Sequence, residues 1–283
     1  MRTLRLIIAI TVLFVLMLAC QKQETVSLSG KIKTSKLVLF NGTDSIDYKY
    51  NYQYNSDVKL ESILMSSDYY ASMPVVLYQV QYQTDKVILN DTTSLTAVFY
   101  LQPGTNLIDS VINFYQSENK NGIKVLRASN NNIIKIVPAQ EPGLISSNYY
   151  VDSFVYVGNE LKSYTVFFSS FGTSFFVNYE LSYNLTQNKR VDNDNFQMDN
   201  KAGFLGISSF ILNDFGILGI SLGNTSTHAI ASVRQKDINY PLMDWTTTDY
   251  TYLENTPGNL SVDYTTTPLS GADFTQLRNT YYP

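Results

Sequence analysis

The chain has 283 residues, of which 44% are hydrophobic, 13% aromatic and 16% charged. This composition excludes a disordered chain, and the length is sufficient for a single all-β domain with a large core. The net charge of −4 and the pI of about 5.0 exclude the broad basic surface that binds nucleic acid. With one Cys and one His, a His/Cys metal cluster or a Cys–His catalytic pair is excluded within one chain, and we expect no cofactor.

The N-terminus has the parts of a secretory signal peptide. Arg2 and Arg5 precede an apolar run from Leu6 to Leu18, and the small residue Ala19 follows it. The run has about thirteen residues, whereas a helix that spans a membrane needs about twenty, so a retained anchor is the weaker alternative. We therefore expect residues 1–19 to be removed as a signal peptide.

The single Cys stands directly after this predicted signal peptide. The sequence Leu16-Met17-Leu18-Ala19-Cys20 resembles the lipobox of bacterial lipoproteins, in which the Cys thiol receives a diacylglycerol and the new amino terminus is acylated, commonly with palmitate. The resemblance implies that Cys20 is a lipid attachment site and that a membrane is a partner. In well-studied lipoproteins, an Asp directly after the lipidated Cys resembles an inner-membrane retention signal, and this chain has Gln21 there. The resemblance therefore favours the outer membrane, and either its periplasmic or its surface-exposed side. An ordinary signal peptide with a chance Cys is the alternative.

The polar stretch after Cys20 shows no sustained period. We interpret residues 20–36 as the lipidated Cys and a flexible tether, which leaves residues 37–283 as a single β domain.

The domain begins with tyrosines at every second position. Tyr48, Tyr50, Tyr52 and Tyr54 alternate with polar residues, which places all four on one face of a strand. A turn at 55–57 and a second apolar stretch follow, so the pattern predicts a β-hairpin of 48–54 with 60–64. The same pattern predicts further antiparallel pairs at 76–82 with 87–89, 97–101 with 107–115, 123–127 with 133–137, 151–157 with 161–168, 161–171 with 174–186, and 246–253 with 260–266. The count suggests about a dozen antiparallel strands in an all-β, many-stranded curved sheet.

The alternation stops between Asp192 and Thr227. Residues 203–222 are apolar and punctuated by glycines, with spacings that fit a short buried helix or a strand. We expect this segment to act as a plug that covers the hydrophobic face at the open end or interior of the curved sheet.

The Tyr-rich hairpin 48–63 resembles the repeating unit of secreted lipoproteins of unknown function from Bacteroidetes-type bacteria, in which a tyrosine strand, an Asn/Asp turn and a Leu-x-x-Ile strand recur. The stretches 199–204 and 223–230 are similar to two later landmarks of that family. The resemblance spans about 46–265 and implies a porin-like, strongly curved antiparallel sheet or barrel, with no established activity.

Three sets of residues could form a catalytic or metal site. His228 could act as the base of a catalytic triad, but no G-x-S-x-G motif is present, and a hydrogen-bonded loop histidine is the simpler interpretation. Asp192, Asp194 and Asp199 could offer oxygens to Ca²⁺, although the spacing is not that of an EF-hand. Two carboxylates suffice for glycoside hydrolysis, and the sequence selects no pair among its 24 acidic residues.

The 22 tyrosines are explained first by the preference of Tyr for half-buried sheet surfaces. Exposed aromatic faces also stack on sugars or peptides, and Trp245 is the best single candidate for such a ligand-binding position.

The sequence thus predicts a lipid-anchored cell-envelope protein that acts as a binding or structural module and is not an enzyme. A glycan, a lipid or another envelope protein is the expected partner, and no nucleic acid. The alternatives are a lipid- or glycan-carrying lipoprotein with an apolar cavity, a carboxylate-based glycoside hydrolase, and a transmembrane barrel, whose signature is also a series of alternating strands of about ten residues.

Overall fold

The computed structural model describes residues 28, 31–41, 44–67, 75–91, 95–115, 119–139, 149–158, 160–170, 173–188, 215–223, 228–239, 246–256, 259–267 and 274–281. Within these ranges the chain forms sixteen antiparallel strands and one short 3-10 helix, η2 (Phe215–Leu218). No helix in the described ranges is long and apolar enough to cross a bilayer. The strands are β1 (Ile32–Asn41), β2 (Asp44–Tyr54), β3 (Leu60–Ser67), β4 (Val75–Tyr82), β5 (Lys86–Asn90), β6 (Leu95–Leu101), β7 (Ile108–Tyr115), β8 (Asn119–Arg127), β9 (Ile133–Pro138), β10 (Tyr149–Val157), β11 (Glu160–Ser170), β12 (Thr173–Asn188), β13 (His228–Asp237), β14 (Thr246–Thr256), β15 (Asn259–Thr267) and β16 (Phe274–Tyr281).

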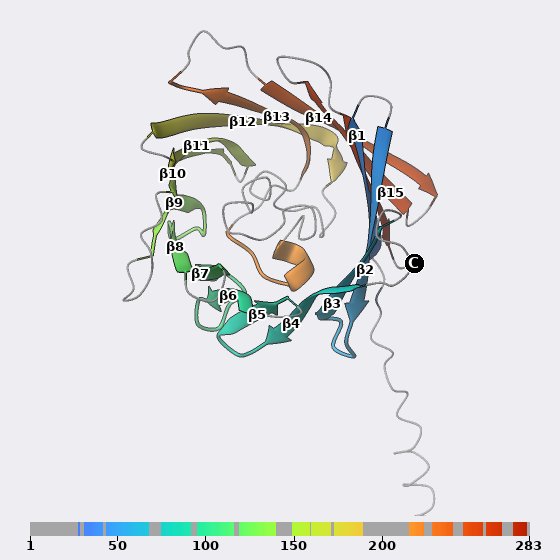
Figure 1. The fold of residues 1–283 in the computed structure, drawn as a ribbon. Coiled ribbons are helices and arrows are strands. Elements are labelled where there is room, and N and C mark those ends of the chain that lie inside the picture. Colours follow the sequence, from blue (N-terminus) through green and yellow to red (C-terminus); the bar gives the residue numbers. More distant parts are fainter. Residues whose placement is uncertain are drawn as a thin grey trace, which may run out of the picture.

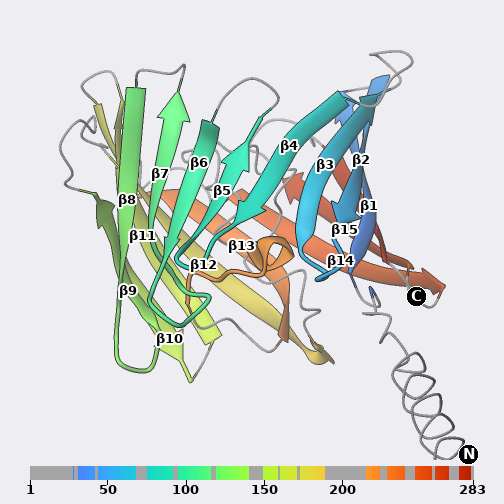
Figure 2. The same cartoon turned by 90° about the horizontal axis from the view of Figure 1, so that it is seen from below.

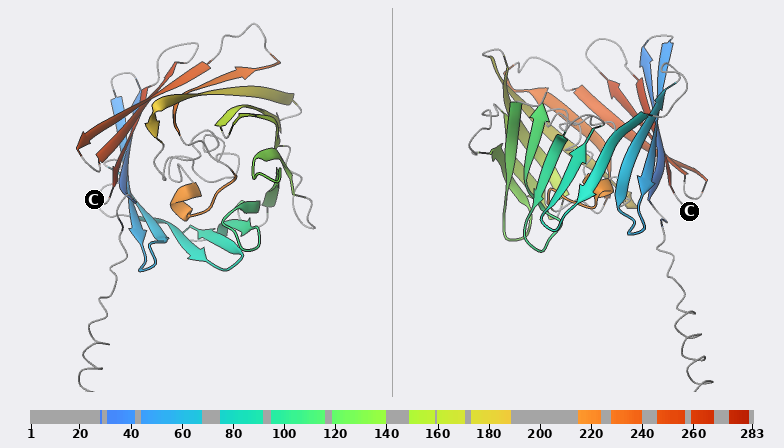
Figure 3. Two further views of the ribbon diagram at one scale, coloured as in Figure 1. Left: turned by 180° about the vertical axis from the view of Figure 1, so that it is seen from behind. Right: turned by 60° about the horizontal axis from the view of Figure 1, so that its bottom comes forward.

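The strands form a closed barrel in which each one pairs with its neighbours in the sequence (Figure 1). Closure is made by β1 and β16, whose register runs from Ile32 opposite Tyr281 to Leu39 opposite Thr275. A closed sheet has no free edge that could pair with another chain. The side views in Figures 2 and 3 show the strands tilted around the wall, as closure of a sheet requires.

The described side chains of the inner face are mainly apolar, because the strands that carry them turn hydrophobic positions inward. Tyr50 and Tyr52 are 4% and 3% exposed, whereas Lys49 and Gln53 on the same strand are exposed. Burial raises the pKa of Tyr50 to about 12, with smaller contributions from Tyr48 and Tyr78, which is the behaviour of a phenol in a poorly hydrated environment.

A segment of the chain itself lies inside the barrel. Figures 1 and 3 show η2 within the ring of strands. Ile217, Leu218, Ile220 and Leu222 are all buried and belong to the same hydrophobic cluster as the wall residues. We call residues 215–223 the plug segment.

The outer face of the wall carries ion pairs between neighbouring strands. Lys36 and Asp47 join β1 to β2 with a distance of 2.6 Å between Nζ and Oδ2, and Lys135 and Asp152 join β9 to β10 at 3.2 Å. Glu180 on β12 and Arg234 on β13 lie 3.5 Å apart. Pairs of this kind contribute little to stability in water, but they show that the wall presents charged side chains outward at several places around the barrel.

The structure confirms the all-β fold, here as a closed barrel, and the antiparallel pairing of all seven predicted strand pairs. It also places the described part of the predicted plug, residues 215–222, inside the barrel. Residues 203–214 lie outside the described ranges.

Two expectations need correction. The strand count is sixteen rather than about a dozen, because three strands show no period of two. In β1 the apolar residues are consecutive at 37–40, and β13 and β16 have few large apolar residues. The sheet also begins at Ile32, so residues 32–36 belong to β1 and not to the tether. Ser35 is fully buried there and hydrogen-bonded to Tyr52, and Tyr54 Oη donates to the Ile32 carbonyl at 2.9 Å.

Candidate functional site

A polar groove on the outer wall is the candidate site, and strands β2, β3 and β4 build it. Gln53 on β2 lies opposite Ser62 on β3, and Ser62 lies opposite Gln79 on β4. Because these three residues form one row across the sheet, their side chains share the outer face. Gln81 occupies the next outward position on β4, since Val80 between them is buried.

A β-bulge adds a carboxylate to this row. The register shifts between Gln53 and Tyr54, so that Tyr54 pairs with Leu60 while Gln53 pairs with Ser62. The extra residue, Glu61, is exposed beside Ser62, although strict alternation would turn it away from Ser62. The bulge therefore places the Glu61 carboxylate and the Ser62 hydroxyl side by side at successive positions of β3.

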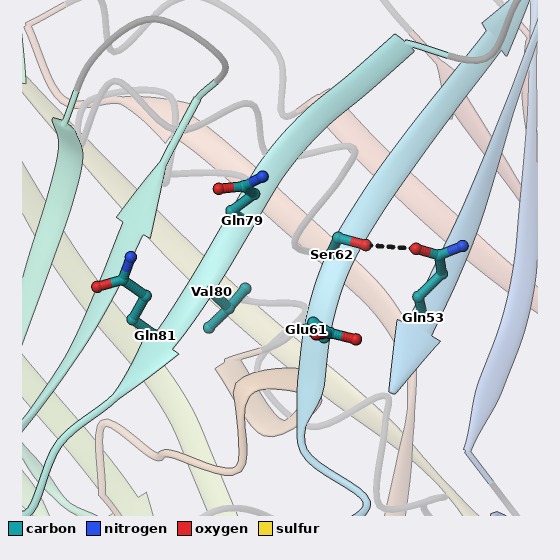
Figure 4. A pocket seen from close by; sticks show the side chains of 6 residues that line it. All are labelled: Gln53, Glu61, Ser62, Gln79, Val80 and Gln81. Carbon is teal, nitrogen blue, oxygen red and sulfur yellow. Dashed lines mark hydrogen bonds between the residues drawn. The ribbon is translucent and has the colours of Figure 1, made fainter. Parts of the chain in front are cut away.

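The groove has a volume of about 480 Å³ (Figure 4). Ser62 Oγ donates to Gln53 Oε1 at 2.7 Å, which orients the Gln53 amide within the row. The lining consists of Gln53, Glu61, Ser62, Gln79, Val80 and Gln81.

The lining is a hydrogen-bonding surface with one charged side chain, Glu61. Amide side chains offer both N–H donors and C=O acceptors, and the Ser62 hydroxyl offers both as well. Glu61 supplies the single carboxylate of the lining, so the two-carboxylate arrangement that glycoside hydrolysis needs is not formed by these residues. Within the described ranges no group of three or more His, Cys, Asp or Glu side chains is placed to hold a metal ion.

His228 lies elsewhere, at the start of β13. Its Nδ1 is 2.5 Å from Oε1 of Glu160 on β11, so the side chains meet across β12. Burial of Glu160 raises the pKa of its carboxyl, but hydrogen bonds from Lys162 and His228 outweigh this and lower the pKa overall. The histidine is hydrogen-bonded, as the simpler interpretation held, although it belongs to a strand rather than a loop.

The outer wall also carries stacked aromatic rings near the opposite end of the barrel. The rings of Tyr150 and Phe167 are stacked, with centroids 4.5 Å apart, and Phe167 contacts Phe176 at 4.8 Å. Lys135 Nζ lies 5.5 Å from the Tyr150 centroid. Because these rings cover one another's faces, they are not an open platform on which a sugar could stack.

The other residues singled out from the sequence lie outside the described ranges. These are Cys20, Trp245, Asp192, Asp194 and Asp199. Sequence reasoning in turn missed the groove. A signal was present, because Gln53, Gln79 and Gln81 occupy polar positions of strands whose alternate positions are Tyr or Val. What the sequence could not show was the bulge at Glu61 and the register that brings three strands into one row.

Comparison with known proteins supports the fold. No protein-family model matches the chain, and no curated protein matches it. A solved structure of a porin-like protein from Bacteroides uniformis is similar, with a TM-score of 0.59 and 11% sequence identity over 89% of this chain and 98% of that chain. A porin-like protein from Bacteroides vulgatus matches with a TM-score of 0.48 and 11% identity over 89% of this chain and 99% of that one. The first of these similarities shows that this chain has a porin-like β fold.

Proposed function

We propose that the protein is a lipid-anchored barrel of the bacterial outer membrane that stands in water beside the bilayer and acts as a binding module, without catalytic activity. The observation that carries this proposal is the polarity of the wall. A transmembrane barrel presents an apolar band to lipid and a polar interior to water. Here apolar residues such as Tyr52 and Ile63 face a filled interior, and the Lys36–Asp47, Lys135–Asp152 and Glu180–Arg234 pairs lie on the outside.

The free-energy cost of placing charged side chains in lipid favours water around this wall. A Lys or Arg on the lipid face near the bilayer midplane costs about 2–4 kcal/mol, and ion pairs occur at three places around the barrel. The plug segment supports the same conclusion, because its apolar side chains pack against the inner face of the wall, whereas a porin lines that face with polar residues.

Anchoring then depends on Cys20 and not on the barrel. We expect the double variant Met17→Ala/Cys20→Ala to leave the membrane fraction, because it removes the lipidated thiol and creates an Ala-x-Ala site at which an ordinary signal peptidase can cut. The measurement is fractionation of cells with a carbonate wash, with the mass of the processed protein checked. Met17→Leu is the matched control, since Leu is the usual lipobox residue there, and it should stay in the membrane. A processed double variant that still resists the wash would mean that the barrel itself spans the bilayer.

The groove on β2–β4 favours a glycan as the ligand of this module. Its lining offers donors and acceptors in one row with a single charge, which suits a neutral molecule rich in hydroxyls better than an anion or an apolar lipid. We expect Gln79→Ala/Gln81→Ala to weaken glycan binding about tenfold, because two neutral hydrogen bonds at about 0.5–1.5 kcal/mol each are lost. A glycan array with the full-length protein measures this. Gln235→Ala, at another exposed glutamine on β13, is the control, and equal binding by both variants would exclude the groove.

A further inference from the structure

Among the side chains whose exposure the structure describes, most of the exposed large apolar ones lie at one end of the barrel. In an antiparallel barrel, the N-terminus and all turns from even- to odd-numbered strands lie at the same end. Leu126 and Ile134 flank the β8–β9 turn, Val155 and Val157 precede the β10–β11 turn, and Leu185 lies near the end of β12. Among the side chains whose exposure is described, Ile238, after β13, is an exposed large apolar residue at the opposite end. We call the five residues Leu126, Ile134, Val155, Val157 and Leu185 the apolar rim.

The residues of the apolar rim project from the outside of the wall. Leu126 is 39% exposed and Ile134 53%, while Val125 and Ile133 beside them are buried in the core. Val157 is 62% exposed, whereas its neighbour Tyr156 turns inward and accepts a hydrogen bond at Oη from the Ile133 N–H at 3.1 Å. Buried side chains and a hydrogen bond on the inner face thus stabilise this part of the wall, while the apolar side chains on its outer face are exposed to water.

The chain enters the barrel at this same end. β1 begins at Ile32, and about eleven residues separate it from Cys20, which an extended chain spans in at most about 40 Å. A lipid on Cys20 would therefore hold this end of the barrel close to the bilayer. The opposite end would point away from it.

We propose that the apolar rim docks on the surface of the bilayer that holds the Cys20 lipid, an inference that rests on the proposed anchor. Each partly exposed Val, Leu or Ile removes apolar surface from water when it enters the headgroup boundary. The contact is weak by itself, but the tether converts docking into an intramolecular step with a high effective concentration. Lys135 lies directly opposite Leu126 in the register and pairs with Asp152, so insertion there is limited to the headgroup boundary, where the charged groups stay hydrated.

The groove lies near the same end of the barrel, because Gln53, Ser62 and Gln81 stand next to the β2–β3 and β4–β5 turns. Strands β2–β4, which carry the groove, lie across the ring from β9 and β10, which carry much of the apolar rim (Figure 1). A ligand in the groove would therefore bind close to the bilayer surface, on the other side of the barrel from the apolar rim.

The test places an environment-sensitive NBD fluorophore at either end of the full-length, lipidated protein. Val157→Cys and Ile238→Cys introduce the label at apolar positions of similar exposure, 62% and 51%, at opposite ends of the barrel. Each protein is incorporated into phosphatidylethanolamine/phosphatidylglycerol vesicles that contain brominated lipid. We expect a blue-shifted emission and loss of most of the fluorescence for the label at 157, and little change for the label at 238.

The outcomes separate this inference from the anchor. If the vesicles float without the protein, the lipid anchor fails and so does the proposed function. If the protein floats but neither label is quenched, the anchor stands and docking of the apolar rim is wrong. Equal quenching at both ends would also overturn it, because the barrel would then lie on its side or within the bilayer.

Discussion

Replacing Arg127 by Met should destabilise the barrel by roughly 2–4 kcal/mol and release the plug segment. Arg127, at the end of β8, turns into the barrel, where its Nε donates to the Leu222 carbonyl at 2.8 Å and its Nη2 donates to the Ile108 carbonyl. One side chain thus joins the plug segment to the wall. Met fills a similar volume but leaves both carbonyls without this donor.

The surroundings of Arg127 make this a costly change. Burial lowers the pKa of its guanidinium, an effect that the nearby Asp109 partly opposes, so the group lies in a poorly hydrated environment where lost hydrogen bonds are not replaced by water. Two backbone bonds hold the same junction: Ile108 N–H donates to the Ser221 carbonyl at 2.8 Å, and Ser221 N–H donates to the Asn106 carbonyl at 2.9 Å. We expect these to weaken when the plug segment loosens.

Urea unfolding of the purified protein measures the loss of stability, and chymotrypsin measures release of the plug segment. Leu218 is 1% exposed, so cleavage beside it requires the plug segment to leave the wall. Arg234→Met is the matched control, because Arg234 lies on the outer wall in an exposed pair with Glu180 and should cost less than about 1 kcal/mol. Equal stability of the two variants would mean that apolar contacts alone hold the plug segment.

Replacing Gly223 by Ala should also destabilise the protein, by about 1–3 kcal/mol. A Cβ atom at this position would lie 2.8 Å from the Asn131 carbonyl oxygen and 2.9 Å from Cγ1 of Ile133. The carbonyl cannot easily move, because the β8–β9 turn is closed by hydrogen bonds from Ala128 N–H to the Asn132 carbonyl and from Asn131 N–H to the Ala128 carbonyl. The plug segment would have to shift instead.

The control for Gly223→Ala is Gly219→Ala, four residues earlier in the plug segment. Gly219 has a φ of +70°, but nothing lies within 4 Å of the Cβ that alanine would add, so its cost is that of the left-handed backbone alone, about 1 kcal/mol. Thermal unfolding of both variants separates steric contact from backbone strain. A smaller loss for Gly223→Ala than for Gly219→Ala would contradict the close packing between the plug segment and the β8–β9 turn.

Local patterns predicted most of the sheet. The alternation at Tyr48–Tyr54 predicted the β2 strand and its buried face, and Tyr50 and Tyr52 are buried as expected. Turn residues predicted the hairpins, for example at 130–132 between β8 and β9. The strands β13 and β16, which the sequence did not predict, are held in place by pairing with neighbouring strands. β13 pairs with β12 over most of its length, and β16 lies between β15 and β1. Their own sequences are too polar or too small-residue-rich to show an apolar face.

By itself, the sequence determined the strand pattern and the presence of an apolar segment before β13, because side-chain alternation and turn chemistry act between residues close in the chain. Only the tertiary structure decided that the sheet closes, since closure joins β1 to β16 across nearly the whole chain. It also decided that the apolar face is the inner one, where residues from many strands and the plug segment join in one buried cluster. The groove and the Arg127 junction follow from the same long-range order: the groove needs the registers of three strands, and Arg127 reaches a carbonyl 95 residues away.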